Sequence, residues 1–191
     1  MKTTLVAIST ALVLATSLGA QTIINGGFED DPVTPGGYDP ITPTGWTYVG
    51  GIPWVTSVTA PGAVGGAAGD NYLQAERFMI ISQDISGLIV GQEYEITYLI
   101  GNSEYPKPDI QIGSVSIGGV VVDHVDYNGS GVPMTPASIV FTAGSTIETL
   151  LLYSKSGTTA FDGFSITPIP EPRAALLIGL SGVALIARRR N

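Results

Sequence analysis

Hydrophobic and polar residues alternate in short runs through the middle of the chain. Across residues 93–100, Tyr94, Ile96, Tyr98 and Ile100 occupy every second position, and Glu95 and Thr97 lie between them on the other face. The runs are rich in Val, Ile, Thr and Tyr and are separated by Gly, Pro, Asn and Asp, as is typical of β-strands joined by turns. We therefore predict strands over residues 22–28, 54–59, 72–74, 78–85, 93–100, 110–117, 120–127, 138–142, 147–154 and 161–167.

About ten short strands in one domain predict an all-β fold, a β-sandwich in which two sheets cover each other's hydrophobic faces. Gly118-Gly119 separates two valine-rich runs and predicts a tight hairpin, because two-residue hairpin turns need positive φ. Residues 31–45 contain four prolines and three glycines, which predicts a surface loop. Residues 21–168 are long enough to form this single domain with a sizeable core.

The two ends of the chain have a different pattern. Residues 1–20 combine Lys2, an apolar stretch and a small-residue end at Gly19-Ala20, which predicts a secretory signal peptide. Residues 174–187 are all apolar or small and would form a helix with no polar face. Such a helix would span only about 21 Å of a hydrocarbon core of roughly 30 Å, so its length alone favours a buried helix of a soluble domain. The residues that flank it must therefore decide whether it crosses a membrane. The basic residues that follow favour a transmembrane helix with a cytoplasmic C-terminus (Arg188, Arg189 and Arg190).

The segment 169–191 also contains a short motif before the apolar run, made of Pro170, Glu171 and Pro172. This motif, the helix and the terminal arginines together resemble the PEP-CTERM sorting signal of Gram-negative bacteria. The resemblance implies that a membrane protease, exosortase, is a partner that reads the motif. It also implies an exported protein, anchored at least transiently and destined for the cell surface or extracellular matrix. An ordinary tail anchor is the alternative, since it needs only the apolar run and the basic end.

Composition excludes several kinds of function. The chain has no cysteine, which excludes a thiol nucleophile and a Cys/His zinc site. Residues 21–168 hold three basic residues and fifteen acids, a net charge of −12. Nucleic acid and anionic lipid both attract basic surfaces, so neither is expected to bind the domain.

Several local patterns resemble, in order, the galactose-binding-like jelly roll that is common among bacterial carbohydrate-binding modules. They lie at residues 25–29, 45–46, 81–94, 141–143 and 161–166. That family often holds a structural calcium ion between its first and last strands, and the resemblance puts Glu29 and Asp162 at the matching positions. Calcium takes six to eight oxygen ligands, so backbone carbonyls would have to complete the shell. The alternative is that Glu29 lies in a solvated acidic turn and Asp162 caps another turn.

Sugar binding is the function that the loops favour. Aromatic faces stack on sugar rings while amides and carboxylates bind their hydroxyl groups. Four aromatic residues in or beside Gly- and Pro-rich segments are therefore candidate ligand-binding residues, with three polar residues as further contacts. They are Trp46, Tyr48, Trp54 and Tyr105, with Asn102, Glu104 and Asp109. The alternative for Trp46 and Trp54 is that they pack in the core.

Residues for catalysis are few. His124 is the single histidine, and a lone strand histidine is usually structural. Glu93 and Glu95 would share one strand face, which is more typical of a solvated edge than of an acid/base pair. We therefore expect a non-catalytic surface protein that binds polysaccharide, without a required cofactor. A purely structural matrix protein and a weak glycoside hydrolase are the alternatives.

Overall fold

The computed structural model describes residues 21–102, 110–126 and 132–170, and this part of the chain is all-β. Its strands are β1 (Tyr38–Pro40), β2 (Thr47–Val49), β3 (Trp54–Ser57), β4 (Asn71–Ala75), β5 (Met79–Ser86), β6 (Glu93–Asn102), β7 (Gln111–Ile117), β8 (Val120–Asp126), β9 (Val132–Thr142), β10 (Ile147–Ser156) and β11 (Thr159–Pro168). None of the described residues forms a helix with the length and hydropathy needed to cross a membrane. The predicted signal peptide, Tyr105 and everything from Glu171 onward lie outside the described residues.

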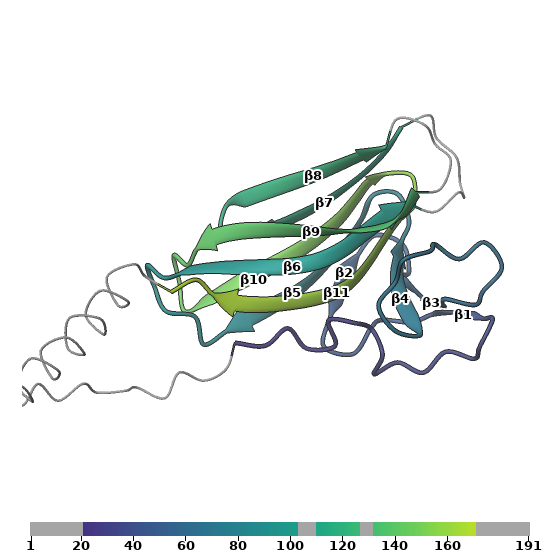
Figure 1. Ribbon diagram of the computed structural model, residues 1–191, viewed down its shortest axis with the longest axis horizontal. Helices are drawn as coiled ribbons and strands as arrows, with labels where there is room; N and C mark the ends of the chain where they lie inside the picture. The colour runs from purple at the N-terminus through teal and green to yellow at the C-terminus, as the bar shows by residue number, and fades with distance from the viewer. Residues whose placement is uncertain (1–20, 103–109, 127–131, 171–191) are drawn as a thin grey trace, which may run out of the picture.

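The strands form two antiparallel sheets that face each other (Figure 1). One sheet has the order β1-β3-β4-β11-β6-β9 and the other the order β2-β5-β10-β7-β8. The two last strands occupy inner positions, β10 between β5 and β7 and β11 between β4 and β6. The predicted all-β class with two covering sheets is thus confirmed.

The alternation predicted for residues 93–100 is confirmed in β6. Tyr94, Ile96 and Tyr98 lie in the core between the sheets, whereas Thr97 on the opposite face is exposed. The predicted hairpin is also confirmed, since Gly118 and Gly119 have φ angles of 56° and 78° between the paired strands β7 and β8. The strand was predictable because one of its faces is buried, and the hairpin was predictable because two adjacent glycines accommodate positive φ angles.

The predicted strand at residues 22–28 is wrong, because this segment forms turns. Asn25 and Phe28 have positive φ angles of 48° and 57°, which are incompatible with an extended strand. The segment still docks on the last strand, since the Phe164 amide donates to the Gly26 carbonyl at 2.9 Å and Phe28 is buried against the Phe164 ring. Hydrophobic packing of Phe28 therefore fixes the segment where a strand ladder was expected.

The predicted surface loop at residues 31–45 contains the short strand β1, and β9 begins before its predicted start. β9 runs through Pro133 and Pro136, which lack the amide hydrogen that an inner strand would need. It can contain them because it lies at the edge of its sheet.

Candidate ligand-binding face of the six-stranded sheet

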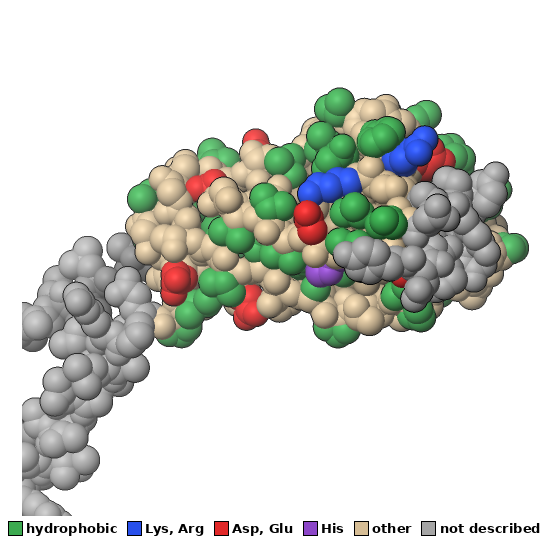
Figure 2. All heavy atoms as spheres, turned by 90° about the horizontal axis from the view of Figure 1, so that it is seen from above, with side chains coloured by type: hydrophobic (Ala, Val, Ile, Leu, Met, Phe, Trp, Pro, Cys, Tyr) green, Lys and Arg blue, Asp and Glu red, His purple; other side chains and the backbone are tan. Residues whose placement is uncertain are grey.

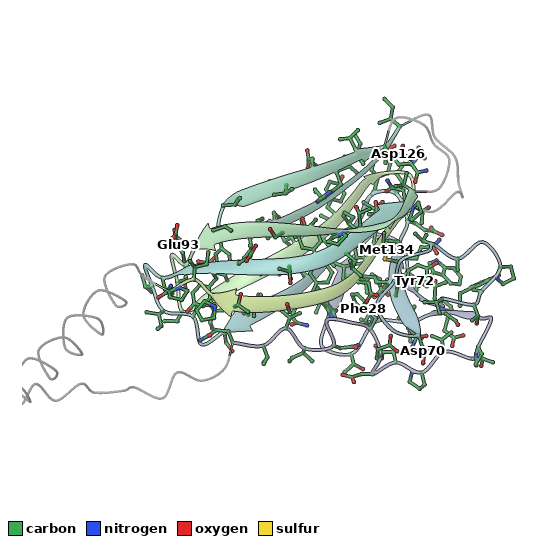
Figure 3. All side chains as sticks on the ribbon, viewed as in Figure 1. Phe28, Asp70, Tyr72, Glu93, Asp126 and Met134 are labelled. Carbon is green, nitrogen blue, oxygen red and sulfur yellow. The ribbon has the colours of Figure 1, made fainter. Side chains whose placement is uncertain are left out.

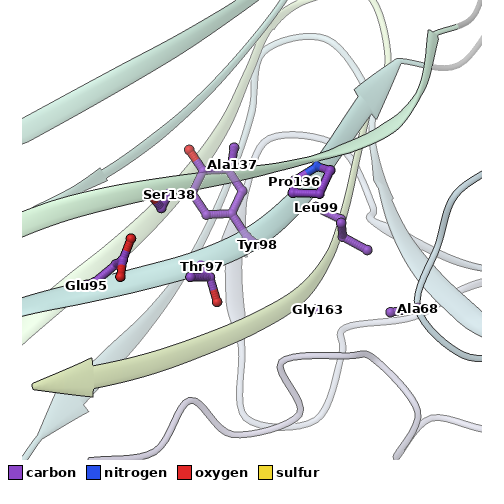
Figure 4. A pocket seen from close by; sticks show the side chains of 9 residues that line it. All are labelled: Ala68, Glu95, Thr97, Tyr98, Leu99, Pro136, Ala137, Ser138 and Gly163. Carbon is purple, nitrogen blue, oxygen red and sulfur yellow. The ribbon is translucent and has the colours of Figure 1, made fainter.

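An open depression of about 650 Å³ lies on the outer face of the six-stranded sheet. Its floor is formed by β6 and β9, where Thr97 and Ser138 are directly opposite each other, with Glu95 further along β6 (Figure 4). The Thr97 hydroxyl lies 2.9 Å from the hydroxyl of Ser165 on β11. The floor thus presents a carboxylate and several hydroxyl groups to solvent.

One wall of the depression includes Ala68, which belongs to the loop of residues 58–70 that crosses the outer face of the same sheet. A small hydrophobic cluster packs this loop against the sheet, and it contains Val64, Tyr72, Met134 and Ala160. Figure 3 labels two of its members, Tyr72 and Met134. Two hydrogen bonds support the cluster: the Val64 amide donates to the Tyr72 hydroxyl at 3.0 Å, and the Met134 amide donates to the Gly65 carbonyl at 2.7 Å. The wall is therefore a packed part of the structure.

The loop is also fixed by Glu29 and Asp162, the two predicted calcium ligands. Asp162 accepts a hydrogen bond from the Ala68 amide at 2.6 Å. One oxygen of Glu29 accepts from the amides of Asp70 and Asn71 at 2.8 and 2.9 Å, and the other accepts from the Asn71 side chain at 3.1 Å. The structure thus brings carboxylates from the first and last parts of the domain to one short loop.

The electrostatic environment of Asp162 is unfavourable for its charged form. Asp162 is fully buried, and burial is the main reason that its pKa is raised to about 7. Hydrogen bonds from the amides of Ala68 and Gly163 oppose this rise, whereas the negative charge of Glu29 adds to it. A cation between the two groups would remove both the repulsion and much of the cost of burying the charge.

The two acidic residues have the type of oxygen ligand that calcium prefers, but they are too few to complete its coordination shell. Glu29 and Asp162 offer carboxylate oxygens, the ligands that this ion prefers. The described residues contain no group of three or more His, Cys, Asp or Glu side chains that could hold a metal. A calcium ion here would therefore depend on backbone carbonyls, and Glu29 and Asp162 would supply its charge neutralisation.

The predicted aromatic residues do not converge. Trp46 is only 4 % exposed and packs in the core against Phe28 and Phe164, at ring-centroid distances of 5.6 and 5.9 Å. Its indole N–H donates to the Asn25 carbonyl at 3.3 Å. Tyr48 is partly buried against the same core. The Trp46 ring is therefore unable to stack on a ligand without leaving the core, whereas the Tyr48 ring is only partly covered.

Trp54 has a different position, on the outer face of β3. Its neighbour Val55 points into the core, so the Trp54 ring lies on the same side of the sheet as the depression. The ring contacts Tyr38, which is 59 % exposed, with centroids 5.3 Å apart in an edge-to-face arrangement. The pair forms an aromatic edge on β1 and β3, separated from the depression by the strand β4 and the loop 58–70.

The polar candidates lie elsewhere. Asn102 is buried at the end of β6, whereas Glu104 and Asp109 lie outside the described residues. His124 on β8 faces inward, and its Nε2 is 2.9 Å from the Tyr98 hydroxyl. Burial lowers the pKa of His124, although the charge of Asp123 acts in the opposite direction. Burial also raises the pKa of Tyr98 to about 12. This contact is part of the sandwich interior.

Sequence reasoning missed several surface residues. Tyr38 was assigned to a loop, although its partner Trp54 was a candidate. Thr97 could have been found, because the alternation in residues 93–100 places it on the solvent face. Phe78 is exposed with a positive φ of 68°, and the Arg77 guanidinium lies 4.9 Å from its ring centre. No signal in the sequence marks that conformation.

No protein-family model matches the chain, and no curated protein matches it in sequence. Solved structures do match. The enzymatically active domain of bacteriophage CBA120 tailspike protein 4 has a TM-score of 0.50 and 12 % identity, over 78 % of this chain and 21 % of the tailspike chain. The chain thus spans about a fifth of that protein's length, and the likeness is one of fold.

Carbohydrate-binding modules are also among the similar structures. TmCBM61, solved with β-1,4-galactotriose, has a TM-score of 0.48 and 15 % identity, over 79 % of this chain and all of that one. The xylan-binding module CBM22-1 of Paenibacillus barcinonensis Xyn10C has a TM-score of 0.48 and 16 % identity, over 76 % of this chain and 93 % of the module. What the present chain does must therefore be inferred from its own surface.

Proposed function

We propose that the protein is an exported, non-catalytic module that binds an extracellular polysaccharide through the outer face of its six-stranded sheet. The depression above β6 and β9 carries this proposal, because Glu95, Thr97 and Ser138 present a carboxylate and hydroxyl groups on an open surface. Sugar hydroxyl groups are recognised by side chains of these types. Tyr38 and Trp54 add ring faces on the same side of the sheet.

The galactose-binding-like resemblance of the sequence supports the same function, and it adds calcium. In this proposal Glu29 and Asp162 would hold a structural calcium ion that keeps the loop 58–70 against the sheet. The ion would supply positive charge between two carboxylates, and it would take no part in a reaction. The shape of the depression would then depend on calcium through its Ala68 wall.

We also propose that exosortase sorts the protein at residues 170–172 and that the apolar segment 174–187 anchors it in the membrane of a Gram-negative bacterium. The order of motif, apolar run and arginines in the sequence supports this route. Mass spectrometry of the protein from its native cells tests it, and we expect a mature form that starts near Gln21 and ends close to Pro172. Recovery of a chain that still ends at Asn191 would favour a simple tail anchor.

Binding is best measured by calorimetry with a panel of soluble polysaccharides that includes β-1,4-galactan and xylan. We expect Trp54→Ala, and separately the double change Thr97→Ala with Ser138→Ala, to weaken binding by at least about tenfold, a change of 1.4 kcal/mol. Two matched controls should bind normally. Phe78→Ala removes an exposed aromatic ring at another site, and Thr149→Ala removes an exposed hydroxyl from the other sheet.

The double variant and Trp54→Ala distinguish the two possible binding positions on this face, the depression and the aromatic edge. Loss of binding in the double variant alone would place the ligand in the depression, and loss in Trp54→Ala alone would place it at the aromatic edge. Unchanged binding by both variants would show that this face does not bind the polysaccharide. Release of reducing sugar from any ligand would contradict the non-catalytic part of the proposal.

A further inference from the structure

The edges of the two sheets are unequally protected against pairing with another strand. Among the described strands, β1 and β9 flank one sheet and β2 and β8 the other. β1 and β2 have three residues each, and β9 contains two prolines. β8 has seven residues, four of them valines, and no proline. Short strands and prolines are the usual protection of an edge, so β8 is the least protected of the four.

The outward side chains of β8 are apolar and exposed. Val121 is 58 % exposed and Val125 is 42 % exposed, and Asp123 lies between them on the same face. Figure 1 shows β8 along the upper margin of the sandwich. Figure 2 looks onto that margin and shows hydrophobic side chains around the histidine and beside a contact between an acidic and a basic side chain. An exposed valine-rich edge of this kind favours association.

One charge on this edge would oppose association, and it is compensated within the chain. The Asp123 carboxylate accepts from Lys155 of β10, with Nζ and Oδ1 2.6 Å apart. The net charge of −8 already includes Lys155, so the ion pair leaves the overall charge unchanged and acts only on the local repulsion between two Asp123 side chains. Lys155 therefore neutralises the acid that would meet its equivalent if two copies approached through β8.

We propose that β8 pairs with β8 of a second copy in antiparallel orientation, which joins the two five-stranded sheets into one. The strand is self-complementary about Asp123, because a two-fold axis there would bring Val121 of each copy opposite Val125 of the other. Val122 would then lie opposite His124 on the inner face. This dimer goes beyond the proposed sugar binding and uses the opposite sheet, so the two can fail independently.

Disulfide trapping tests the dimer, because the chain has no cysteine of its own. In the full-length protein exported by its native cells, Asp123→Cys would place two thiols across the axis. Directly opposite residues in antiparallel strands have Cα atoms about 4.5–5.5 Å apart, within the range that a disulfide spans. We expect mild oxidation to convert this variant to a dimer of twice the monomer mass on a non-reducing gel.

Val140→Cys is the matched control, since Val140 is 45 % exposed on β9, the edge strand of the other sheet. It should give little dimer. Adding Val121→Lys and Val125→Lys to Asp123→Cys should abolish the cross-link, because lysines would then face each other in both pairs. These positions are exposed, and an unchanged melting temperature would show that the variant folds. Equal cross-linking of Asp123→Cys and Val140→Cys, persistence with both lysines, or a cross-link to a different protein would each overturn the proposal.

Discussion

The two tryptophans of this protein lie eight residues apart in similar Gly- and Pro-rich surroundings, yet the fold gives them opposite environments. Trp46 is enclosed by Phe28 and Phe164 between the sheets. Trp54 lies on the outer face of β3 beside the exposed ring of Tyr38. The difference shows that such surroundings do not decide whether an aromatic residue becomes core or surface, because Trp46 precedes the short strand β2 and packs in the core, whereas Trp54 lies on the outer face of the short strand β3. Stability and ligand binding should therefore depend on different tryptophans.

The largest expected effect comes from the buried member of the pair. Trp46→Ala should lower the free energy of unfolding by about 3–5 kcal/mol, because it leaves a cavity at the junction of Phe28 and Phe164. Urea denaturation followed by circular dichroism measures the loss. Phe78→Ala serves as a control for removal of an aromatic ring, and it should cost far less because that ring is exposed. A loss below about 1 kcal/mol for Trp46→Ala would show that the ring is not part of the core.

The second effect concerns the carboxylates that fix the loop between the aromatic edge and the depression. In the presence of a chelator, Asp162 should make the protein less stable as the pH rises from about 4 to about 7, because its pKa is raised in the folded state. The native state holds the proton that the unfolded chain releases, so ionisation costs roughly 1.4 kcal/mol for each pH unit in this window. Unfolding free energies between pH 4 and pH 8 measure this slope, and Asp162→Asn should flatten it.

When calcium is present, the stability of the protein should rise with pH, the opposite of its behaviour with a chelator. The ion binds the ionised carboxylates, so it should raise the melting temperature at pH 8 and have little effect at pH 4, where Asp162 is protonated. Asp162→Asn should respond less than the unchanged protein. An identical melt with chelator and with calcium at pH 8 would contradict the site. That result would not bear on sugar binding, which the double change Thr97→Ala with Ser138→Ala tests independently.

The difference between the tryptophans could not be predicted from the sequence, although much of the sheet structure could. In residues 93–100 the pattern was decisive, because a long strand with one buried face alternates over many positions. β2 and β3 have three and four residues, too few for an alternation to show which face is inward. Trp46 precedes β2 altogether, and its burial depends on Phe28 from a distant turn.

The candidate site was likewise only partly predictable. Glu29 and Asp162 were identified through a resemblance, and in the structure both accept hydrogen bonds from amides of the loop 58–70. The depression was not foreseen, because it depends on the register that sets Thr97 opposite Ser138 and on the packing of that loop. Pairings between strands far apart in the chain leave no local trace in a single sequence. The proposed β8 edge is similar, since its lack of protection is visible only once the order of strands is known.

A smaller effect is expected for Glu29, which acts on the same loop from the exposed side. Glu29→Ala removes the acceptor of two backbone amides, those of Asp70 and Asn71, and should cost about 1–2 kcal/mol. The loop should also become more sensitive to protease, and cleavage within residues 58–70 can be located by mass spectrometry. Asp30→Ala is the matched control, because the neighbouring Asp30 is exposed and offers its backbone amide, not its carboxylate, to Asn25. Equal stability of the two variants would remove Glu29 from the support of the loop.

The smallest effect on stability is expected for Trp54, the partly exposed member of the pair. Trp54→Ala should lower the free energy of unfolding by about 1 kcal/mol or less, because its ring lies beside Tyr38 on the outer face of the sheet and is not part of the hydrophobic core. Tyr38→Ala should cost a similar amount, and the double variant should cost less than the sum, since both changes remove the same contact. Measured beside Trp46→Ala, these values separate the two environments directly. If Trp54→Ala destabilised the protein as strongly as Trp46→Ala, the ring would be structural, and its effect on polysaccharide binding could no longer be assigned to contact with the ligand.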